Sequence, residues 1–324
     1  MKRPALDVAD GAMLLTATIW AGNNVVVKDA VAEIDPVAYV VVRFAIGAAL
    51  LFPALRLAGI SLAVPRRDWR ALVLAGISGF AIYNTLFTVG LESTSAFSAA
   101  LLISLGPFFT ALIAVVLGLE PIRRRQWVGI AVAVAGVALF VGDKLAGSAP
   151  VRGDVLTLAA AVTFSVYSLA NRQLTIRTPA ATVIAWSTLI GLVCVLPLGL
   201  GPVWVQDWGK IGPEGWGALL YSSILSMLLA YSLWAWAIGR RGVGRTVPYL
   251  YLVPIMTGAL AVVLQGEEFG PLKIVGAAVT LLGLALTRTR LPRQVPPEPV
   301  SGVDLADPDI MPETVRPPAL SGRP

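Results

Sequence analysis

The sequence predicts an all-α membrane protein with ten transmembrane helices, arranged as two inverted five-helix repeats with cytoplasmic N- and C-termini. Three observations carry this prediction: an apolar composition, ten apolar segments and an internal duplication. Hydrophobic residues make up 56% of the 324 residues, charged residues only 14%, and the mean hydropathy is +0.78. A soluble domain carries roughly 25% charged residues because water must wet its surface. Most of this chain is therefore expected to face membrane lipids.

Ten apolar segments account for the helices in this prediction. Each approaches the roughly 20 residues that a helix needs to cross a bilayer. Gly, Ala and Ser are frequent within them, as expected for helices that pack closely against one another in a membrane. In chain order the segments are 11–28, 37–56, 69–91, 95–119, 126–142, 154–171, 180–200, 215–239, 246–265 and 271–287.

The basic residues predict the orientation of these helices. Lys and Arg accumulate in the cytoplasmic loops of membrane proteins. With a cytoplasmic N-terminus, 17 of the 25 basic residues fall in segments on the cytoplasmic side and only five on the opposite side. Because these residues are spread over several loops rather than gathered in one domain, the net charge of +6 does not indicate a nucleic-acid partner.

The second half of the chain repeats the first at a constant offset of 147 residues. Pro107 and Glu120 recur as Pro254 and Glu267, for example. Five spans separate equivalent positions, and because this number is odd the second copy enters the membrane from the opposite side. Inverted repeats of this kind build transporters, which enclose a site near the middle of the membrane. The alternative is an old duplication that serves packing only.

The repeat also predicts the domains. Residues 1–145 form the first five-helix transmembrane repeat, and residues 146–290 form the second, inverted one. Residues 291–324 are rich in Pro with interleaved Asp and Glu, so they are expected to form a disordered cytoplasmic tail.

Polar residues form matching stripes on the first and sixth helices. Thr16, Trp20 and Asn24 are spaced four residues apart and share one helix face. Polar side chains at this depth are costly unless they face protein or a cavity, so the stripes predict a shared substrate pocket. The alternative is that they join helices by hydrogen bonds. The equivalent residues in the second copy are Thr163, Tyr167 and Asn171.

Aromatic residues on the third and eighth helices are further candidates for substrate binding. They are Tyr83 and Phe87, together with the polar Asn84 between them, in the first copy and Tyr231 and Trp234 in the second. Aromatic rings with polar tips can surround a small organic solute with stacking area and a few hydrogen bonds. We therefore include all five in the predicted pocket.

Two basic residues lie within predicted spans. Lys28 is one turn beyond Asn24, and Arg43 is one or two turns into the second span. A basic residue in a membrane segment is a functional candidate, and these two are predicted to attract a carboxylate or another anionic group. The alternative is that their long side chains reach back to the membrane surface. Pro107 and Pro254 are predicted hinges, or else passive kinks, because proline interrupts helical hydrogen bonding.

The sequence lacks the residues that several kinds of chemistry require. The chain has no histidine, and its one cysteine, Cys194, excludes an internal disulfide, so no metal or cofactor is expected. No Asp or Glu lies near the middle of a span, so facilitated diffusion or coupling to the gradient of the solute itself is as plausible as proton antiport. A nucleotide-binding G-x-x-x-x-G-K-[ST] loop is absent from the sequence, which disfavours an ATP-driven pump.

Short motifs within this framework resemble the EamA transporters of the drug/metabolite transporter superfamily. The resemblance covers about residues 8–288 and rests on the stretch from Trp20 to Lys28, on Arg43-Phe44 and on the turns around Glu120 and Glu267. Ala21 follows Trp20 where the family pattern has Gly, which shifts the register to Lys28 by one residue. The resemblance implies a bacterial inner-membrane carrier, often an exporter of amino acids or related metabolites. It also implies a central cavity lined by helices one, three, four, six, eight and nine.

The sequence thus predicts a secondary transporter, and not an enzyme, that exports an amino acid or related carboxylate-bearing solute by alternating access around a central cavity. One alternative is a carrier of cationic or nucleotide-type solutes in the same superfamily. Another is a structural or regulatory membrane protein that does not transport. A membrane-embedded enzyme would need a cluster of acids or a nucleophile with a base, and the sequence suggests none. The oligomeric state is left open, and a monomer is compatible with these features.

Overall fold

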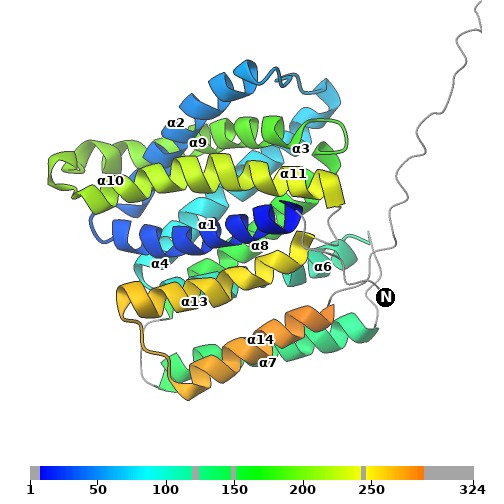
Figure 1. Ribbon diagram of the computed structural model, residues 1–324, viewed down its shortest axis with the longest axis vertical. Helices are drawn as coiled ribbons and strands as arrows, with labels where there is room; N and C mark the ends of the chain where they lie inside the picture. Colours follow the sequence, from blue (N-terminus) through cyan, green and yellow to red (C-terminus); the bar gives the residue numbers. More distant parts are fainter. Residues whose placement is uncertain (1–7, 119–123, 147–150, 242–245, 288–324) are drawn as a thin grey trace, which may run out of the picture. The chain divides into compact units, whose positions relative to one another are not determined.

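The computed structural model describes residues 8–118, 124–146, 151–241 and 246–287 (Figure 1). All regular secondary structure in these ranges is helical, which confirms the all-α prediction. Helices lie at each of the ten predicted places, with ends within a few residues of those expected. The predicted tail at 291–324 lies outside the described residues.

Helices of the two copies follow one another in the same order. The first copy contains α1 (Val8–Ala30), α2 (Pro36–Leu57), α3 (Trp69–Ala75), α4 (Tyr83–Glu92), α5 (Ala96–Ile103), α6 (Gly106–Val116) and α7 (Arg124–Ala146). The second contains α8 (Arg152–Leu174), α9 (Ala180–Val205), α10 (Pro213–Leu220), α11 (Tyr231–Arg241), α13 (Leu252–Gln265) and α14 (Pro271–Thr287). Short 3₁₀-helical turns lie at Arg66–Asp68, Trp208–Lys210 and Val247–Tyr251.

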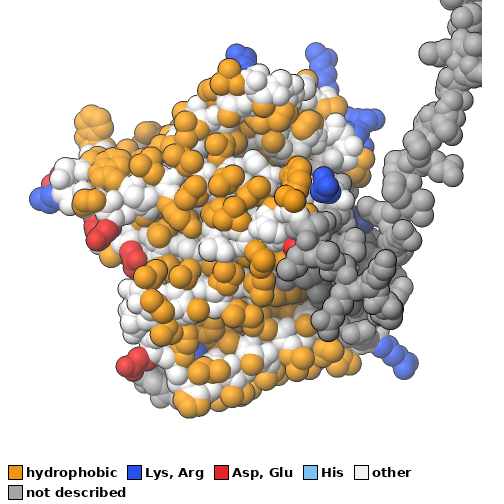
Figure 2. Space-filling view, viewed as in Figure 1, with side chains coloured by type: hydrophobic (Ala, Val, Ile, Leu, Met, Phe, Trp, Pro, Cys, Tyr) orange, Lys and Arg blue, Asp and Glu red, His pale blue; other side chains and the backbone are white. Residues whose placement is uncertain are grey.

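Length and composition fit these helices to a membrane. In the described part of the chain, six segments are long and apolar enough to cross a bilayer, and three shorter apolar helices accompany them. The helix α1 is as long, at 23 residues, but it carries the polar residues Asn23, Asn24 and Lys28. Figure 2 shows apolar side chains over most of the visible face, with acidic side chains along one edge and most basic side chains elsewhere on the periphery. The six segments are Pro36–Leu57, Arg66–Glu92, Ala96–Val116, Arg152–Leu174, Ala180–Val205 and Pro213–Trp234.

Four of the ten segments are interrupted, at equivalent places in the two copies. A π-helix at Gly76–Ile82 joins α3 to α4, and another at Tyr221–Ala230 joins α10 to α11. The fourth segment breaks between α5 and α6, and the ninth begins with a 3₁₀ turn before α13. Pro107 and Pro254 each stand in the first turn of the α-helix that follows the irregular backbone. The prolines therefore mark the interruptions in the fourth and ninth segments, whereas no proline marks the π-helices.

The helices α7 and α14 pack closely side by side (Figure 1). Glycines make this approach possible, since Gly136 lies against the backbone of Thr280 and Gly283 against that of Ala133. A side chain at either glycine would overlap the facing helix. Small residues at membrane helix interfaces commonly serve this purpose.

Hydrogen bonds join the connecting segments at one end of the helices, which we call the Glu33 end. Glu33 accepts a hydrogen bond from the backbone N–H of Gly212 at 2.8 Å. Gln206 accepts one from the N–H of Asp35 at 3.0 Å and donates one to the carbonyl of Glu33 at 3.1 Å. The Gln265 amide reaches Asp29 at 2.6 Å. These contacts place the connections after α1, α9 and α13 together.

A second set of contacts joins the connections at the other end, which we call the Arg177 end. Arg177 binds the carboxylate of Asp68 through two hydrogen bonds, at 2.6 and 3.1 Å. Bonding to that carboxylate raises the pKa of the Arg177 guanidinium still further above the physiological range. Thr182 donates to the carbonyl of Ser61 at 2.7 Å. The segments that follow α2 and α8 therefore meet at this end.

Candidate functional site

The buried cation Arg43 is the centre of the candidate site. Its residue is only 6% exposed, on α2. One terminal nitrogen donates to Oδ1 of Asn84 at 3.3 Å, while Nε has no hydrogen-bond partner. No carboxylate in the described ranges forms an ion pair with it. A buried charge without a counter-charge is costly, so this guanidinium is suited to receive an anionic group of a ligand.

Asn84, at the start of α4, holds the guanidinium in place. Its amide nitrogen donates to the carbonyl of Gly79, five residues earlier in the π-helix, at 3.1 Å. Since a carbonyl only accepts and a guanidinium only donates, the orientation of this amide is chemically determined. Gly79 in turn lies directly against the ring of Tyr167, where a larger residue would not fit.

One aromatic cluster joins α1 to α11. The ring of Trp20 lies 5.3 Å from that of Tyr231, in an edge-on arrangement, and 5.6 Å from that of Trp234. The indole N–H of Trp20 points to the carbonyl of Ser226 at 3.4 Å, within the second π-helix. Three of the predicted substrate-binding residues are thus brought together by the fold.

A second aromatic cluster joins α4 to α8. The ring of Tyr83 lies 5.0 Å from Phe164 and 5.9 Å from Phe87, and Tyr167 lies 5.4 Å from Phe164 and 5.8 Å from Phe80. Phe80 and Phe164 were not predicted as site residues. Phe80 precedes Asn84 by four residues and Phe164 precedes Tyr167 by three. This spacing, which brings side chains together on a helix surface, is the signal that could have identified them.

The guanidinium of Arg43 reaches the second cluster through Asn84, which follows Tyr83 in α4. A cation beside aromatic rings can bind a carboxylate while the rings contact the apolar part of the same molecule. In the part of the chain that the structure describes, no group of three His, Cys, Asp or Glu residues could hold a metal ion. Chemically, this arrangement can accommodate a small organic anion or zwitterion.

Asn24 and Asn171 occupy different environments despite their equivalent positions. Asn24 donates to the hydroxyl of Thr257 on α13 at 3.1 Å. The equivalent threonine, Thr110, instead donates to the carbonyl of Gly106 in its own helix at 2.8 Å. Within the described residues no hydrogen bond joins it to Asn171. The two copies therefore differ at this pair of positions.

The remaining predicted polar residues donate to backbone carbonyls. The Lys28 ammonium donates to the carbonyls of Leu91 and Glu92, at 2.9 and 3.0 Å, at the end of α4. Thr16 and Thr163 each donate to a carbonyl of their own helix, at 2.9 Å. None of these hydrogen bonds places Lys28, Thr16 or Thr163 next to Arg43.

A buried polar network that was not predicted lies between α1, α2 and the second π-helix. Ser222 donates to Oδ1 of Asn23 at 2.8 Å, and its hydroxyl lies 2.6 Å from that of Tyr39. Tyr39 precedes Arg43 by four residues and so shares its helix face, which is the signal that could have identified it. This network ties the helix that carries Arg43 to two neighbours.

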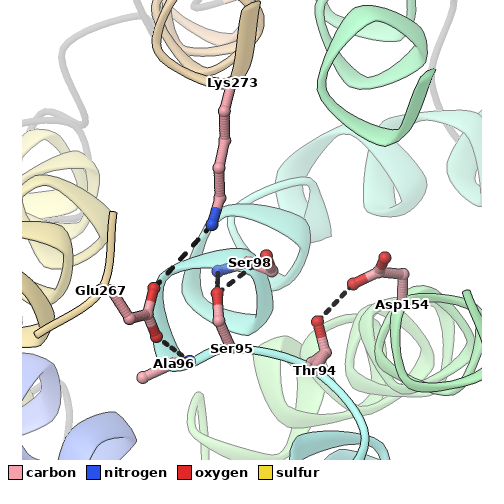
Figure 3. Close-up of polar contacts among 7 residues, drawn as sticks. All are labelled: Thr94, Ser95, Ala96, Ser98, Asp154, Glu267 and Lys273. Carbon is pink, nitrogen blue, oxygen red and sulfur yellow. Dashed lines mark hydrogen bonds and ion pairs between the residues drawn. The ribbon is translucent and has the colours of Figure 1, made fainter. Parts of the chain in front are cut away.

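Charged residues close the Glu33 end between the two copies (Figure 3). Glu267 accepts a hydrogen bond from the N–H of Ala96 at the start of α5, at 3.1 Å, and its other oxygen lies 3.9 Å from the Lys273 ammonium. Nearby, Thr94 donates to Asp154 of α8 at 2.5 Å. The carboxylates of the second copy thus contact backbone and hydroxyl groups of the first.

The helices and the family comparison together identify the class of protein. Several apolar helices of membrane-crossing length define a multi-pass membrane protein. The model of the EamA-like transporter family matches residues 8–142 and again residues 151–289. The chain therefore belongs to the EamA-like transporter family, which confirms the resemblance seen in the sequence. Its relatives are named transporters and efflux pumps, so the protein is a transporter and not an enzyme.

Individual relatives span most of the chain. A protein of Archaeoglobus fulgidus named as an uncharacterized transporter is 28% identical over 86% of this chain and 96% of its own length. A probable terminal-alkyne amino-acid exporter of Streptantibioticus cattleyicolor is 31% identical over 69% of this chain and 74% of its own. A probable amino-acid metabolite efflux pump of Salmonella typhimurium is 28% identical over 84% of this chain and 91% of its own length.

A solved crystal structure shares the fold. It superposes with a TM-score of 0.61 at 22% sequence identity and covers 89% of this chain and 99% of its own. At this identity the likeness bears on the fold alone.

Proposed function

We propose that the protein is a secondary transporter of the bacterial inner membrane that exports an amino acid or a related carboxylate-bearing solute. The observation that carries this proposal is Arg43, a buried guanidinium that has no ion-pair partner among the described residues and is bonded to Asn84, next to the ring cluster of Tyr83. A carboxylate would supply the missing counter-charge. The names of the relatives from Streptantibioticus cattleyicolor and Salmonella typhimurium, which refer to amino acids, support this substrate class.

In this proposal the substrate binds between the aromatic clusters. Trp20, Tyr231 and Trp234 form one wall, and Tyr83, Phe87 and Tyr167 form the other, with Arg43 and Asn84 at the carboxylate. The helices α1 and α8 move between the two states in this proposal. They carry Thr16 and Asn24 and Thr163 and Asn171, respectively. Lys28, already bonded to two carbonyls, contributes to closing the Glu33 end.

Alternating access would use the two copies, residues 1–145 and 146–290, as inverted repeats. Contacts at the Glu33 end join the connections after α1, α9 and α13, whereas those at the Arg177 end join the connections after α2 and α8. Successive helices that run in opposite directions would produce this alternation, which supports the proposed ten spans. The Arg177 end would then face the cytoplasm, in agreement with the distribution of basic residues. Pro107 and Pro254 would act as hinges, next to irregular backbone.

Counterflow in proteoliposomes tests the proposed transport. Vesicles containing the purified protein are loaded with an unlabelled amino acid, amine or nucleotide, and uptake of the same labelled compound is measured. We expect exchange of at least one amino acid or other carboxylate-bearing metabolite. Exchange should be lost in Arg43→Gln and retained in Arg56→Gln, a control at the exposed end of the same helix. Exchange of amines or nucleotides only, or normal exchange by Arg43→Gln, would contradict the proposal.

A thermal-shift screen provides a second test that does not require transport. Detergent-purified protein is heated with amino acids, nucleobases or amines, and the screen is repeated with Asn24→Ala and Asn171→Ala. We expect stabilisation by carboxylate-bearing compounds, and loss of that stabilisation in both variants if the two asparagines act as a pair. Stabilisation that persists unchanged in both variants would exclude both asparagines from substrate binding.

A further inference from the structure

We propose that Asn84 determines the charge preference of the site. Its neutral amide positions Arg43 without neutralising it, so that the site accepts carboxylate-bearing solutes and rejects cations. This inference rests on the proposed function, and it concerns a different residue from the one that carries that proposal. Asn84 would act as a positioning residue through the guanidinium.

The geometry leaves Asn84 little freedom. The residue is 7% exposed, and both ends of its amide are used, one by the Gly79 carbonyl at 3.1 Å and one by Arg43 at 3.3 Å. The acceptor at Gly79 lies in the π-helix, whose longer turn relates residues five positions apart. Backbone geometry therefore orients the amide, and the amide orients the guanidinium.

The chemistry of residue 84 decides whether the guanidinium keeps its charge for a ligand. An aspartate of the same shape would form an ion pair with Arg43, and the pair would carry no net charge. Its second oxygen would also face the carbonyl of Gly79, acceptor against acceptor. The amide avoids both effects, because it satisfies the carbonyl and leaves the positive charge uncompensated.

This charge-setting pair occurs in one copy only. The position equivalent to Arg43 holds Ile190, and the position equivalent to Asn84 holds Tyr231. The symmetry of the repeat is therefore broken at the residues that set charge, although the π-helices beside them occur in both copies. Conformational change alone would not require such a difference, whereas a single binding site for one carboxylate would.

Binding of matched compounds tests the inference. Leucine, 4-methyl-2-oxopentanoate and 3-methylbutylamine share one side chain but carry zwitterionic, anionic and cationic groups, and phenylalanine, phenylpyruvate and phenethylamine form a second such series. Ligand-induced thermal shifts of the purified protein are measured for wild type, Asn84→Asp and Asn84→Ala. Asn23→Asp is the control, because it adds a buried carboxylate beside Ser222 rather than beside Arg43.

In wild type we expect the acids to bind and the amines not to bind. Asn84→Asp should weaken binding of the acids by about tenfold or more, as expected for loss of a charge-assisted interaction, and should therefore lower the ratio of acid to amine affinity. Asn84→Ala should bind the acids several-fold more weakly without binding the amines, since the guanidinium keeps its charge but loses its support. Asn23→Asp should keep the wild-type preference.

Two results would overturn the inference. One is an unchanged ratio of acid to amine affinity in Asn84→Asp. The other, which holds even where Asn84→Asp does not fold, is wild-type affinity for the acids in Asn84→Ala. Failure of the proposed function gives a different result, because wild type itself would then bind none of the acids.

Discussion

Asn24 on α1 donates a hydrogen bond to the hydroxyl of Thr257 on α13, at 3.1 Å. Both side chains are buried, and Thr257 also lies 3.4 Å from the carbonyl of Ala21. The equivalent residues Asn171 and Thr110 make no such bond within the described residues. In transporters built from inverted repeats, equivalent contacts in the two copies belong to the two alternative packings. We therefore expect the two pairs to form in turn as the protein changes state.

Replacing Thr257 by Val should favour opening of the Glu33 end. The change removes the hydroxyl that Asn24 binds in the present state, whereas Thr110→Val removes the one expected to serve the other state. The readout is labelling of Val25→Cys, buried on α1, by a membrane-impermeant maleimide in a Cys194→Ser background. Labelling should become several-fold faster with Thr257→Val and slower with Thr110→Val. Equal labelling rates in the two variants would contradict the expectation that the Asn24–Thr257 and Asn171–Thr110 pairs form in turn.

Lys28 is expected to stabilise the fold rather than to bind the solute. Its ammonium meets the carbonyls of Leu91 and Glu92, where the end of α4 carries partial negative charge. Lys28→Met should therefore cost about 1–2 kcal/mol, or roughly 2–5 °C in apparent Tm. Carboxylate affinity should stay unchanged. Loss of affinity without loss of Tm would instead assign Lys28 to the solute, as the sequence analysis predicts.

The glycines between α7 and α14 should tolerate no side chain. Gly136→Val would drive a methyl group into the backbone of Thr280, whereas Gly142 on the same helix has open space around it. We expect Gly136→Val to lower the apparent Tm markedly and to reduce the yield of monodisperse protein. The matched control Gly142→Val should change the Tm little, because both variants carry the same helix-propensity change. Similar behaviour of the two variants would argue against tight packing at Gly136.

The helices could be predicted from the sequence because a bilayer provides no water to bond the backbone of a spanning segment. Every backbone polar group in a bilayer must be bonded within its own segment, so an apolar run near 20 residues long specifies a helix almost by itself. The repeat then brought Trp20, Tyr231 and Trp234 into one prediction, and the structure places their rings together. Aromatic residues at equivalent depths were therefore informative.

The π-helices could not be predicted in this way. A π-helix differs from an α-helix by a shift in backbone register that tertiary packing supports, and Gly79 and its neighbours have no composition that marks it. The hydrogen-bond partners of Lys28 could not be predicted either, since Leu91 lies 63 residues away along the chain. Phe80 and Phe164 resemble ordinary lipid-facing or core residues until the fold puts them beside Tyr167.

Glu267 shows that a carboxylate at the end of a span can cap a helix far away in the sequence. It accepts a hydrogen bond from an N–H at a helix start, where a negative charge is favourable. The helix is α5, 171 residues earlier, rather than one next to it in the chain. The local sequence could not predict this helix, because the contact depends on how the two copies meet.

The pair of Asp68 and Arg177 should stabilise the Arg177 end more than an ordinary surface ion pair. Arg177 binds both carboxylate oxygens, and the Asp68 side chain is only 5% exposed although that of Arg177 is 39% exposed. Bidentate, partly buried pairs of this kind are stronger than exposed single contacts, which contribute about 0–1 kcal/mol. Lys210 and Asp207, 85% and 56% exposed, provide the comparison.

A double-mutant cycle measures this difference. Asp68→Asn and Arg177→Gln should each lower the apparent Tm by several degrees, and the double variant should lose little more than either alone, so that the two effects are clearly non-additive. The cycle with Asp207→Asn and Lys210→Gln should give a coupling near zero. High salt should reduce the first coupling only in part, since the carboxylate is shielded from solvent. Equal couplings in the two cycles would show that the contact at Asp68 is no stronger than one at the surface.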